Sequence, residues 1–101
     1  MEPVHLAETA ADLPSAWASR TLGEVGPARV KLLRMDELPV AEERHAVAET
    51  LLVLDGVLEL SLDGEPLTVR SGELITIDAG LPHAVRPGSR GTLLIVDSQD
   101  A

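Results

Sequence analysis

Apolar residues from position 29 onward come in short runs that polar or turn-forming residues separate. Residues 29–35 mix apolar and basic positions, whereas residues 50–54 are almost all apolar, as expected for a strand buried on both faces. We expect Gly56 to end that strand and residues 57–62 to form the next one. Further strands are predicted at residues 67–69, 74–77, 83–86 and 92–96. Short strands with frequent turns predict an all-β fold, either a sandwich or a barrel.

Glycine and proline residues mark the connections between these strands. Asp63-Gly64 is a strong signal for a two-residue hairpin turn, Ser71-Gly72 predicts a second turn, and residues 87–91 read as a loop. We expect Glu59, which stands among apolar neighbours, to lie on the exposed face of the hairpin. Arg86 is expected to be a surface charge, because it lies an odd number of positions after the histidine at 83.

The chain of 101 residues is long enough for one small domain. Residues 1–27 differ in pattern from the rest, and we interpret them as a lead-in segment that packs on a β-domain formed by residues 28–101. His5 is expected to be a surface residue near a mobile terminus.

The lead-in is predicted to contain a short helical turn over residues 9–18. Asp12 is a suitable N-cap for it, and Pro14 is tolerated in a first turn. Leu13 and Trp17, four residues apart, are expected to dock this segment onto the β-domain. We favour this structural role of Trp17 over a role in ligand binding.

The amino-acid composition excludes or argues against several classes of function. The formal net charge is −9 and the isoelectric point is near 4.6, which argues against binding to nucleic acid or to anionic membrane surfaces. Cysteine and tyrosine are absent from the sequence, so disulfides, thiolate ligands, a cysteine nucleophile and a phenolic acid are excluded. No apolar run reaches membrane-spanning length and the start is unlike a signal peptide, so we expect a cytoplasmic protein.

Two of the three histidines stand in segments with characteristic spacings. In the first, His45 is followed after three residues by Glu49, and Glu49 after six residues by Gly56. This resembles the second half of the first motif of the cupin superfamily, in which a His-x-His pair precedes the Glu and the Gly.

The second segment carries Gly72, Gly80 and His83 at the spacings of the second cupin motif. The N-terminal stretch with its single tryptophan is also similar to the lead-in of small single-domain cupins, so the resemblance covers nearly the whole chain. It implies an all-β, double-stranded β-helix barrel of the jelly-roll type, with a short N-terminal helical segment.

Three positions depart from the family pattern. Glu43 stands where the first histidine of His-x-His is found, Asp78 where a proline is found, and Pro87 where an asparagine is found. We expect the last two to change turn chemistry and to leave the fold intact. The first affects the metal site.

The resemblance implies a divalent metal inside the barrel, held by His45, Glu49 and His83, with Glu43 in the remaining ligand position. Glu43 and His45 are two residues apart, so on one strand both would point to the same face. Such a set suits Mn, Fe, Ni, Zn or Co, and without Glu43 it resembles a site of two histidines and one carboxylate with open positions. The alternative is a metal-free, hydrogen-bonded cluster. For Glu43 we favour a place in a solvated charged loop, between Glu42 and Arg44.

The first functional hypothesis is a metal-binding cupin barrel that acts as an enzyme on a small carboxylate or sugar derivative, by isomerisation, decarboxylation or oxygenation. Glu43 or Glu49 could then move a proton where it is not a ligand. The second is a non-catalytic, metal-free module that binds a small ligand, and the third is a barrel that chiefly mediates assembly. We expect a homodimer, because a small domain with an aliphatic core gains stability from an interface.

Overall fold

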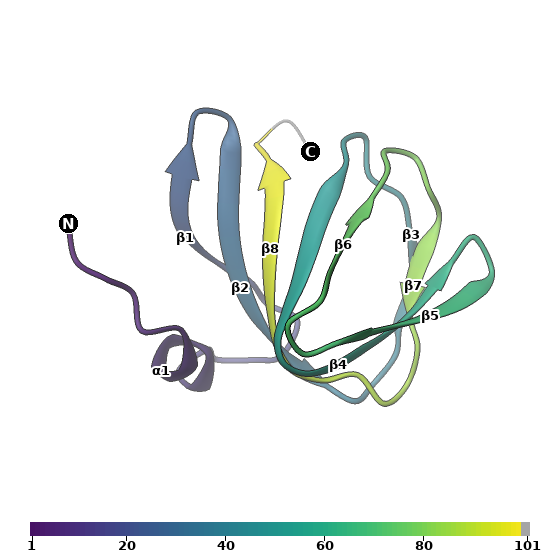
Figure 1. Cartoon of the computed structure of the whole chain (residues 1–101), viewed down its shortest axis with the longest axis horizontal. Helices are drawn as coiled ribbons and strands as arrows, with labels where there is room; N and C mark the ends of the chain where they lie inside the picture. The colour runs from purple at the N-terminus through teal and green to yellow at the C-terminus, as the bar shows by residue number, and fades with distance from the viewer. Residues whose placement is uncertain (100–101) are drawn as a thin grey trace.

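The computed structural model describes residues 1–99 and confirms an all-β fold with one short helix (Figure 1). Its elements follow the chain in this order: α1 (Leu6–Ala11), β1 (Arg20–Val25), β2 (Ala28–Asp36), β3 (Val40–Glu43), β4 (Glu49–Leu62), β5 (Glu65–Arg70), β6 (Leu74–Ile77), β7 (His83–Val85) and β8 (Arg90–Ser98). The predicted strands are all present, although residues 50–54 and 57–62 belong to one strand, β4. The apolar pattern does not indicate β1 or β3.

All strands belong to one antiparallel sheet that curls around an apolar interior. The sheet order is β1-β2-β8-β4-β7-β3, and both β5 and β6 pair with β4. Figure 1 shows β1, β2 and β8 on one side of the molecule and β3, β5 and β7 on the other, with β4 passing between them. The two sides enclose a cluster of aliphatic side chains. Its buried members are Leu33, Met35, Leu51, Val53, Leu58, Leu60, Val69, Ile77, Leu93 and Ile95.

The long strand β4 joins the two sides of the barrel. Its first half pairs with β8 and β6, and its second half pairs with β5 and β7. The expectation that Gly56 ends this strand is wrong, because β4 continues through Gly56 to Leu62 with a register shift between Val53 and Asp55. Gly56 therefore bends the strand instead of breaking it.

The bend depends on two glycines that face each other on neighbouring strands. Gly56 of β4 has a φ of +85° and Gly91 of β8 a φ of +99°, and the two are partners in the register. A Cβ atom on Gly56 would lie 2.0 Å from the carbonyl oxygen of Arg90, and one on Gly91 would lie 2.1 Å from that of Asp55. Only residues without a Cβ fit this crossing of backbones.

The helix lies earlier in the lead-in than predicted. It spans Leu6–Ala11, and Asp12 is its C-cap, not its N-cap. His5 occupies the N-cap position, and its Nδ1 accepts a hydrogen bond from the backbone N–H of Glu8 at 3.4 Å. The helix ends before Pro14, because a residue that precedes proline disfavours helical backbone angles. No helix within residues 1–99 has the length and apolarity needed to span a membrane.

The lead-in is fixed to the outer face of β2. Arg34 donates hydrogen bonds from Nη1 to the carbonyl oxygens of Ala10, at 2.8 Å, and Leu13, at 3.1 Å. Leu13 is buried, and Trp17 packs against the barrel cluster while its Nε1–H donates to Asp36 at 2.8 Å. The segment thus closes one side of the barrel and brings the indole ring to its interior.

The predicted hairpin after β4 is confirmed. Asp63 and Gly64 both have positive φ, +48° and +85°, as two-residue turns between antiparallel strands require. Glu59 and Arg86 are not isolated surface charges. Both are partly buried, and Nη2 of Arg86 lies 3.1 Å from Oε2 of Glu59, so the two side chains form an ion pair.

Candidate metal centre

The predicted site residues come together at the ends of three strands. Glu43 is the last residue of β3, Glu49 the first of β4 and His83 the first of β7. The expectation that Glu43 and His45 share one strand is wrong, because β3 ends at Glu43 and His45 lies in the connection to β4. The backbone N–H of Gly80 donates to the carbonyl oxygen of His45 at 2.8 Å, which ties the two sequence motifs together.

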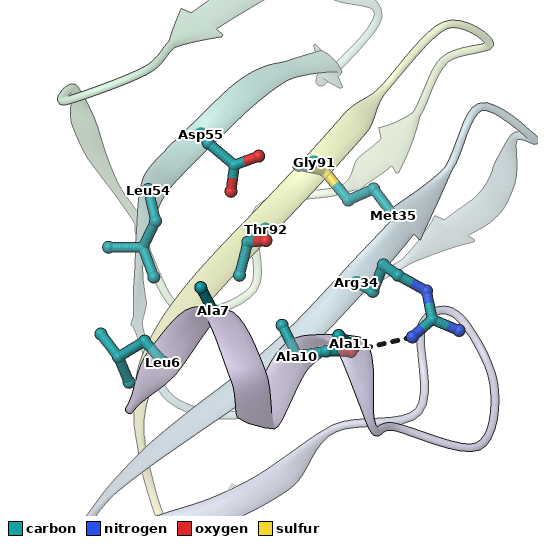
Figure 2. A pocket seen from close by; sticks show the side chains of 10 residues that line it. All are labelled: Leu6, Ala7, Ala10, Ala11, Arg34, Met35, Leu54, Asp55, Gly91 and Thr92. Atoms are coloured by element: carbon teal, nitrogen blue, oxygen red, sulfur yellow. Dashed lines mark hydrogen bonds between the residues drawn. The ribbon is translucent and has the colours of Figure 1, made fainter. Parts of the chain in front are cut away.

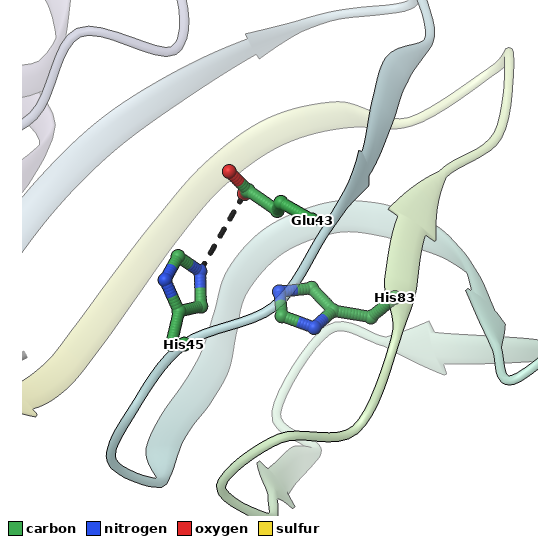
Figure 3. Close-up of side chains that lie close together, drawn as sticks. All are labelled: Glu43, His45 and His83. Carbon is green, nitrogen blue, oxygen red and sulfur yellow. Dashed lines mark ion pairs between the residues drawn. The ribbon is translucent and has the colours of Figure 1, made fainter.

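Two carboxylates contact the histidine pair, and Figure 3 shows one of them, Glu43, beside His45 and His83. The ring centroids of His45 and His83 are 5.0 Å apart. Oε1 of Glu49 lies 3.4 Å from Nε2 of His83 and 3.8 Å from Nε2 of His45. Oε1 of Glu43 lies 3.6 Å from Nε2 of His45, and the ligand atoms of Glu43, His45 and His83 lie within 4.8 Å of one another.

Exposure decreases steadily from Glu43 to His83. The side chain of Glu43 is 53% exposed, that of His45 34%, that of Glu49 15% and that of His83 6%. Glu49 and His83 therefore form the inner part of the site, while Glu43 stands at its mouth. Glu43 is solvated, as the charged sequence around it suggests, yet its carboxylate is turned toward His45.

His83 presents an unsatisfied lone pair to the site. Its Nδ1 lies 3.0 Å from the carbonyl oxygen of Leu81, and a carbonyl only accepts, so Nδ1 carries the ring proton in the neutral imidazole. Nε2 then has a free lone pair, is fully buried and has no hydrogen-bond partner within residues 1–99. It faces Oε1 of Glu49, another acceptor. Two acceptors in this position require a cation or a proton between them, so the donor set fits a divalent metal.

The site opens into a cavity of about 310 Å³ inside the barrel. This volume is at the lower end of the range for small-molecule pockets, roughly 300–1,000 Å³. Its apolar walls come from β2, β3, β4, β7 and β8. They include Leu33, Val40, Leu51, Leu58, Leu60, Val85, Leu93 and Ile95. Trp17 and Ser19 of the lead-in complete the wall, so Trp17 contributes to the cavity in addition to the docking role expected for it.

Sequence reasoning missed a charged group in this cavity. Lys31 of β2 lines it, and its Nζ lies 2.7 Å from Oδ2 of the buried Asp97 on β8. Arg29 also holds Asp97, with Nε 3.0 Å from Oδ1. Burial raises the pKa of Asp97, but hydrogen bonds from Lys31 and Arg29 outweigh this and hold it below its ordinary value. The alternation of Lys31 with Leu33 could have indicated an inward side chain.

A larger hollow of about 660 Å³ lies outside the barrel, between α1 and the strands β2, β4 and β8 (Figure 2). Its lining is mainly aliphatic, with Leu6, Leu54 and Met35 among its residues. The one arginine in it, Arg34, already donates to the backbone of the helix. Histidine is absent from this lining, so we assign the chemistry to the barrel cavity.

The fold and the site define a small antiparallel β-barrel protein with a histidine–carboxylate cluster in its interior. Comparison with known families agrees: the cupin domain model matches residues 35–98, more than half of the chain, so the protein belongs to the cupin family.

Individual relatives share the fold or part of the sequence. Quercetin 2,3-dioxygenase of Bacillus subtilis is 51% identical over 58 residues, which are 57% of this chain but only 16% of that enzyme's length. A cupin-2 domain protein from Shewanella frigidimarina superposes with a TM-score of 0.85 at 20% identity, over 94% of this chain and 93% of its own. Hydroquinone 1,2-dioxygenase in complex with Fe³⁺ also superposes with a TM-score of 0.85, at 13% identity, over 97% of this chain and 32% of its own. The two structural matches show the fold.

Proposed function

We propose that His45, Glu49 and His83 bind a divalent transition metal ion, and that the protein acts on a small molecule held in the barrel cavity. The observation that carries this proposal is the buried Nε2 of His83, which has no hydrogen-bond partner within residues 1–99 and lies 3.4 Å from the carboxylate of Glu49. A bound cation would satisfy both groups at once. Mn, Fe, Ni, Zn and Co all suit these ligands.

Each residue of the site has a distinct task in this proposal. The bound metal would supply a Lewis acid or an oxygen-binding centre. The carbonyl of Leu81 fixes the ring of His83 so that Nε2 points into the site. The aliphatic walls exclude water from the bound molecule. Glu43, at the mouth and in contact with His45, is free to accept a proton from the bound molecule.

Among the possible reactions, we propose oxygenation ahead of isomerisation or decarboxylation. The support is the sequence similarity to quercetin 2,3-dioxygenase, which is high over the 58 matched residues. The match covers only 16% of that enzyme. We therefore use quercetin as a first compound for screening and do not assign it as the substrate of this protein.

The test follows cobalt binding through the fluorescence of Trp17, the only tryptophan, which lines the same cavity. We expect saturable quenching by Co²⁺ in the wild type, and its loss in Glu49→Gln. Glu42→Gln, an exposed neighbour outside the donor set, is the matched control and should bind like the wild type. Quenching that is absent, or that is equal in Glu49→Gln, would contradict the proposal.

A non-catalytic binding protein is the second candidate. The observation that favours it is Glu43, whose side chain is half exposed where the family motif has a histidine. Oxygen uptake by the Fe²⁺-loaded protein, with quercetin and then with small aromatic acids, separates the two candidates. Catalysed uptake supports the enzyme, and metal binding without any turnover supports the binding protein.

We also propose that the protein forms a homodimer. Its support is the exposure of apolar side chains on the barrel surface, with Val25 of β1 75% exposed and Leu74 of β6 62% exposed. A cytoplasmic location remains a prediction from the sequence.

A further inference from the structure

We propose that Lys31 forms a carboxylate-binding subsite in the barrel cavity, so that the substrates are small carboxylates with an apolar body. This inference rests on the proposed function, because it places the other end of the substrate at the metal ligands. Lys31 is the only lysine in the chain, it lines the same cavity as His45 and His83, and its side chain is only 18% exposed.

The sheet register places Lys31 across an apolar span from the metal ligands. Lys31 of β2 is the partner of Ile95 on β8, and Ile95 is the partner of Leu51 on β4. Leu51 points into the cavity and lies two residues after Glu49 on the same face of β4. Two strand spacings of about 4.8 Å put the backbones of Lys31 and Leu51 roughly 10 Å apart. A small molecule can therefore contact both ends of the cavity.

The charges around Lys31 leave a net positive charge at this end. Asp97 is contacted by two cations, with Nζ of Lys31 2.7 Å from Oδ2, and Nη2 of Arg29 3.2 Å from the same oxygen. One carboxylate facing two cations leaves this group of three side chains with a charge of about +1, and the carboxylates that line the cavity, Glu43 and Glu49, belong to the metal end. The ammonium group has three N–H donors, and Asp97 is its one acceptor within residues 1–99, so two donors remain for a ligand.

The local charge contrasts with the rest of the protein. The chain carries a formal net charge of −9, which repels anions at long range. A partly buried ammonium in a cavity with mainly aliphatic walls interacts with an anion more strongly than a solvated one does. Selection of a carboxylate by Lys31 would thus be a local property of the cavity.

The test compares benzoate with benzamide, its uncharged analogue of similar shape, by isothermal titration calorimetry of the Zn²⁺-treated full chain. We expect the wild type to prefer benzoate. Lys31→Met should weaken benzoate binding about tenfold, equivalent to about 1.4 kcal/mol, and leave benzamide binding unchanged. Lys31→Arg should keep most of the preference. Equal benzoate affinity in Lys31→Met and the wild type, or no saturable benzoate binding by the wild type at millimolar concentration, would overturn the inference.

Two further measurements make the outcome independent of folding and of the metal. The ammonium NMR signal of the single lysine should shift with benzoate and not with benzamide in the wild type, and an unchanged signal would overturn the inference. The titrations are repeated after chelation, with metal content determined in each sample. A Lys31-dependent preference in protein that never retains metal would support the subsite and refute the metal site. Protein that retains metal but shows no such preference would support the metal site and refute the subsite.

Discussion

Replacing Gly91 with alanine tests whether the close crossing of β4 and β8 holds the barrel together. A Cβ at this position would lie 2.1 Å from the carbonyl oxygen of Asp55 and 2.7 Å from its carbonyl carbon. Both atoms belong to the backbone of the paired strand, so no side-chain rotation relieves the contact. Gly88 offers a matched control, because its φ is also +99° while nothing lies within 4 Å of the Cβ that alanine would add.

Comparing the two variants separates the free-energy cost of a positive φ from the cost of the steric contact between the strands. Both alanines adopt a positive φ, which costs roughly 2 kcal/mol at each position. Gly91→Ala must in addition push two paired strands apart, and we estimate about 2–3 kcal/mol more from overpacking and weakened ladder hydrogen bonds. The total of about 4–5 kcal/mol is a large part of the 5–15 kcal/mol expected for the stability of a domain of this size.

Urea unfolding, followed by circular dichroism and by the fluorescence of Trp17, gives the free energy of unfolding of each variant. We expect Gly91→Ala to be less stable than Gly88→Ala by about 2–3 kcal/mol, with similar denaturant slopes. Free energies of unfolding that agree within about 0.5 kcal/mol would show that the crossing is not tightly packed, and would refute this reasoning.

Three other predictions concern charge, the lead-in and assembly. Asp97→Asn should lower the free energy of unfolding by roughly 2 kcal/mol at neutral pH. Because the pKa of Asp97 is lowered in the folded protein, its stabilisation is complete above the ordinary value of 3.8 and is lost as the pH falls through the folded value, so the wild type and the variant should converge in acid. Arg34→Met removes the hydrogen bonds to Ala10 and Leu13, and hydrogen exchange in α1 should accelerate, whereas unchanged protection would mean that apolar contacts alone hold the helix. Light scattering at micromolar concentration should give about twice the 10.7 kDa chain mass, and a monomeric mass would contradict the proposed homodimer.

Most strands could be read from the sequence because each is a short apolar run bounded by turn residues, whereas β1 and β3 are mostly exposed and lack such a run. The course of β4 could not, since glycine inside an apolar run predicts a break unless its partner strand is known. Gly56 bends β4 only because Gly91, on a strand much later in the chain, faces it. The sequence predicts the helix too late in the lead-in, because aspartate is a preferred N-cap, whereas in the structure His5 occupies the N-cap and Asp12 the C-cap.

The candidate site, like the fold, could be predicted from the sequence only in part. The spacings around His45, Glu49 and His83 identified three side chains that the structure brings together, with Oε1 of Glu49 within 3.8 Å of Nε2 of both histidines. Lys31 was not identified. Its alternation with Leu33 indicates an inward side chain, but its contact with Asp97 depends on the pairing of β2 with β8. Local spacing reports on neighbours along the chain, whereas this contact joins strands that are distant in sequence.

The central claim, a metal ion held by the histidines and Glu49, is tested most directly by metal content. Inductively coupled plasma mass spectrometry would be applied to untagged protein purified without chelators, alongside His83→Ala and the control Glu42→Gln. We predict about one transition metal ion per chain in the wild type and the control, and loss of the metal in His83→Ala. Wild-type protein that stays free of metal, even after incubation with Mn, Fe, Ni, Zn and Co salts, would contradict the account.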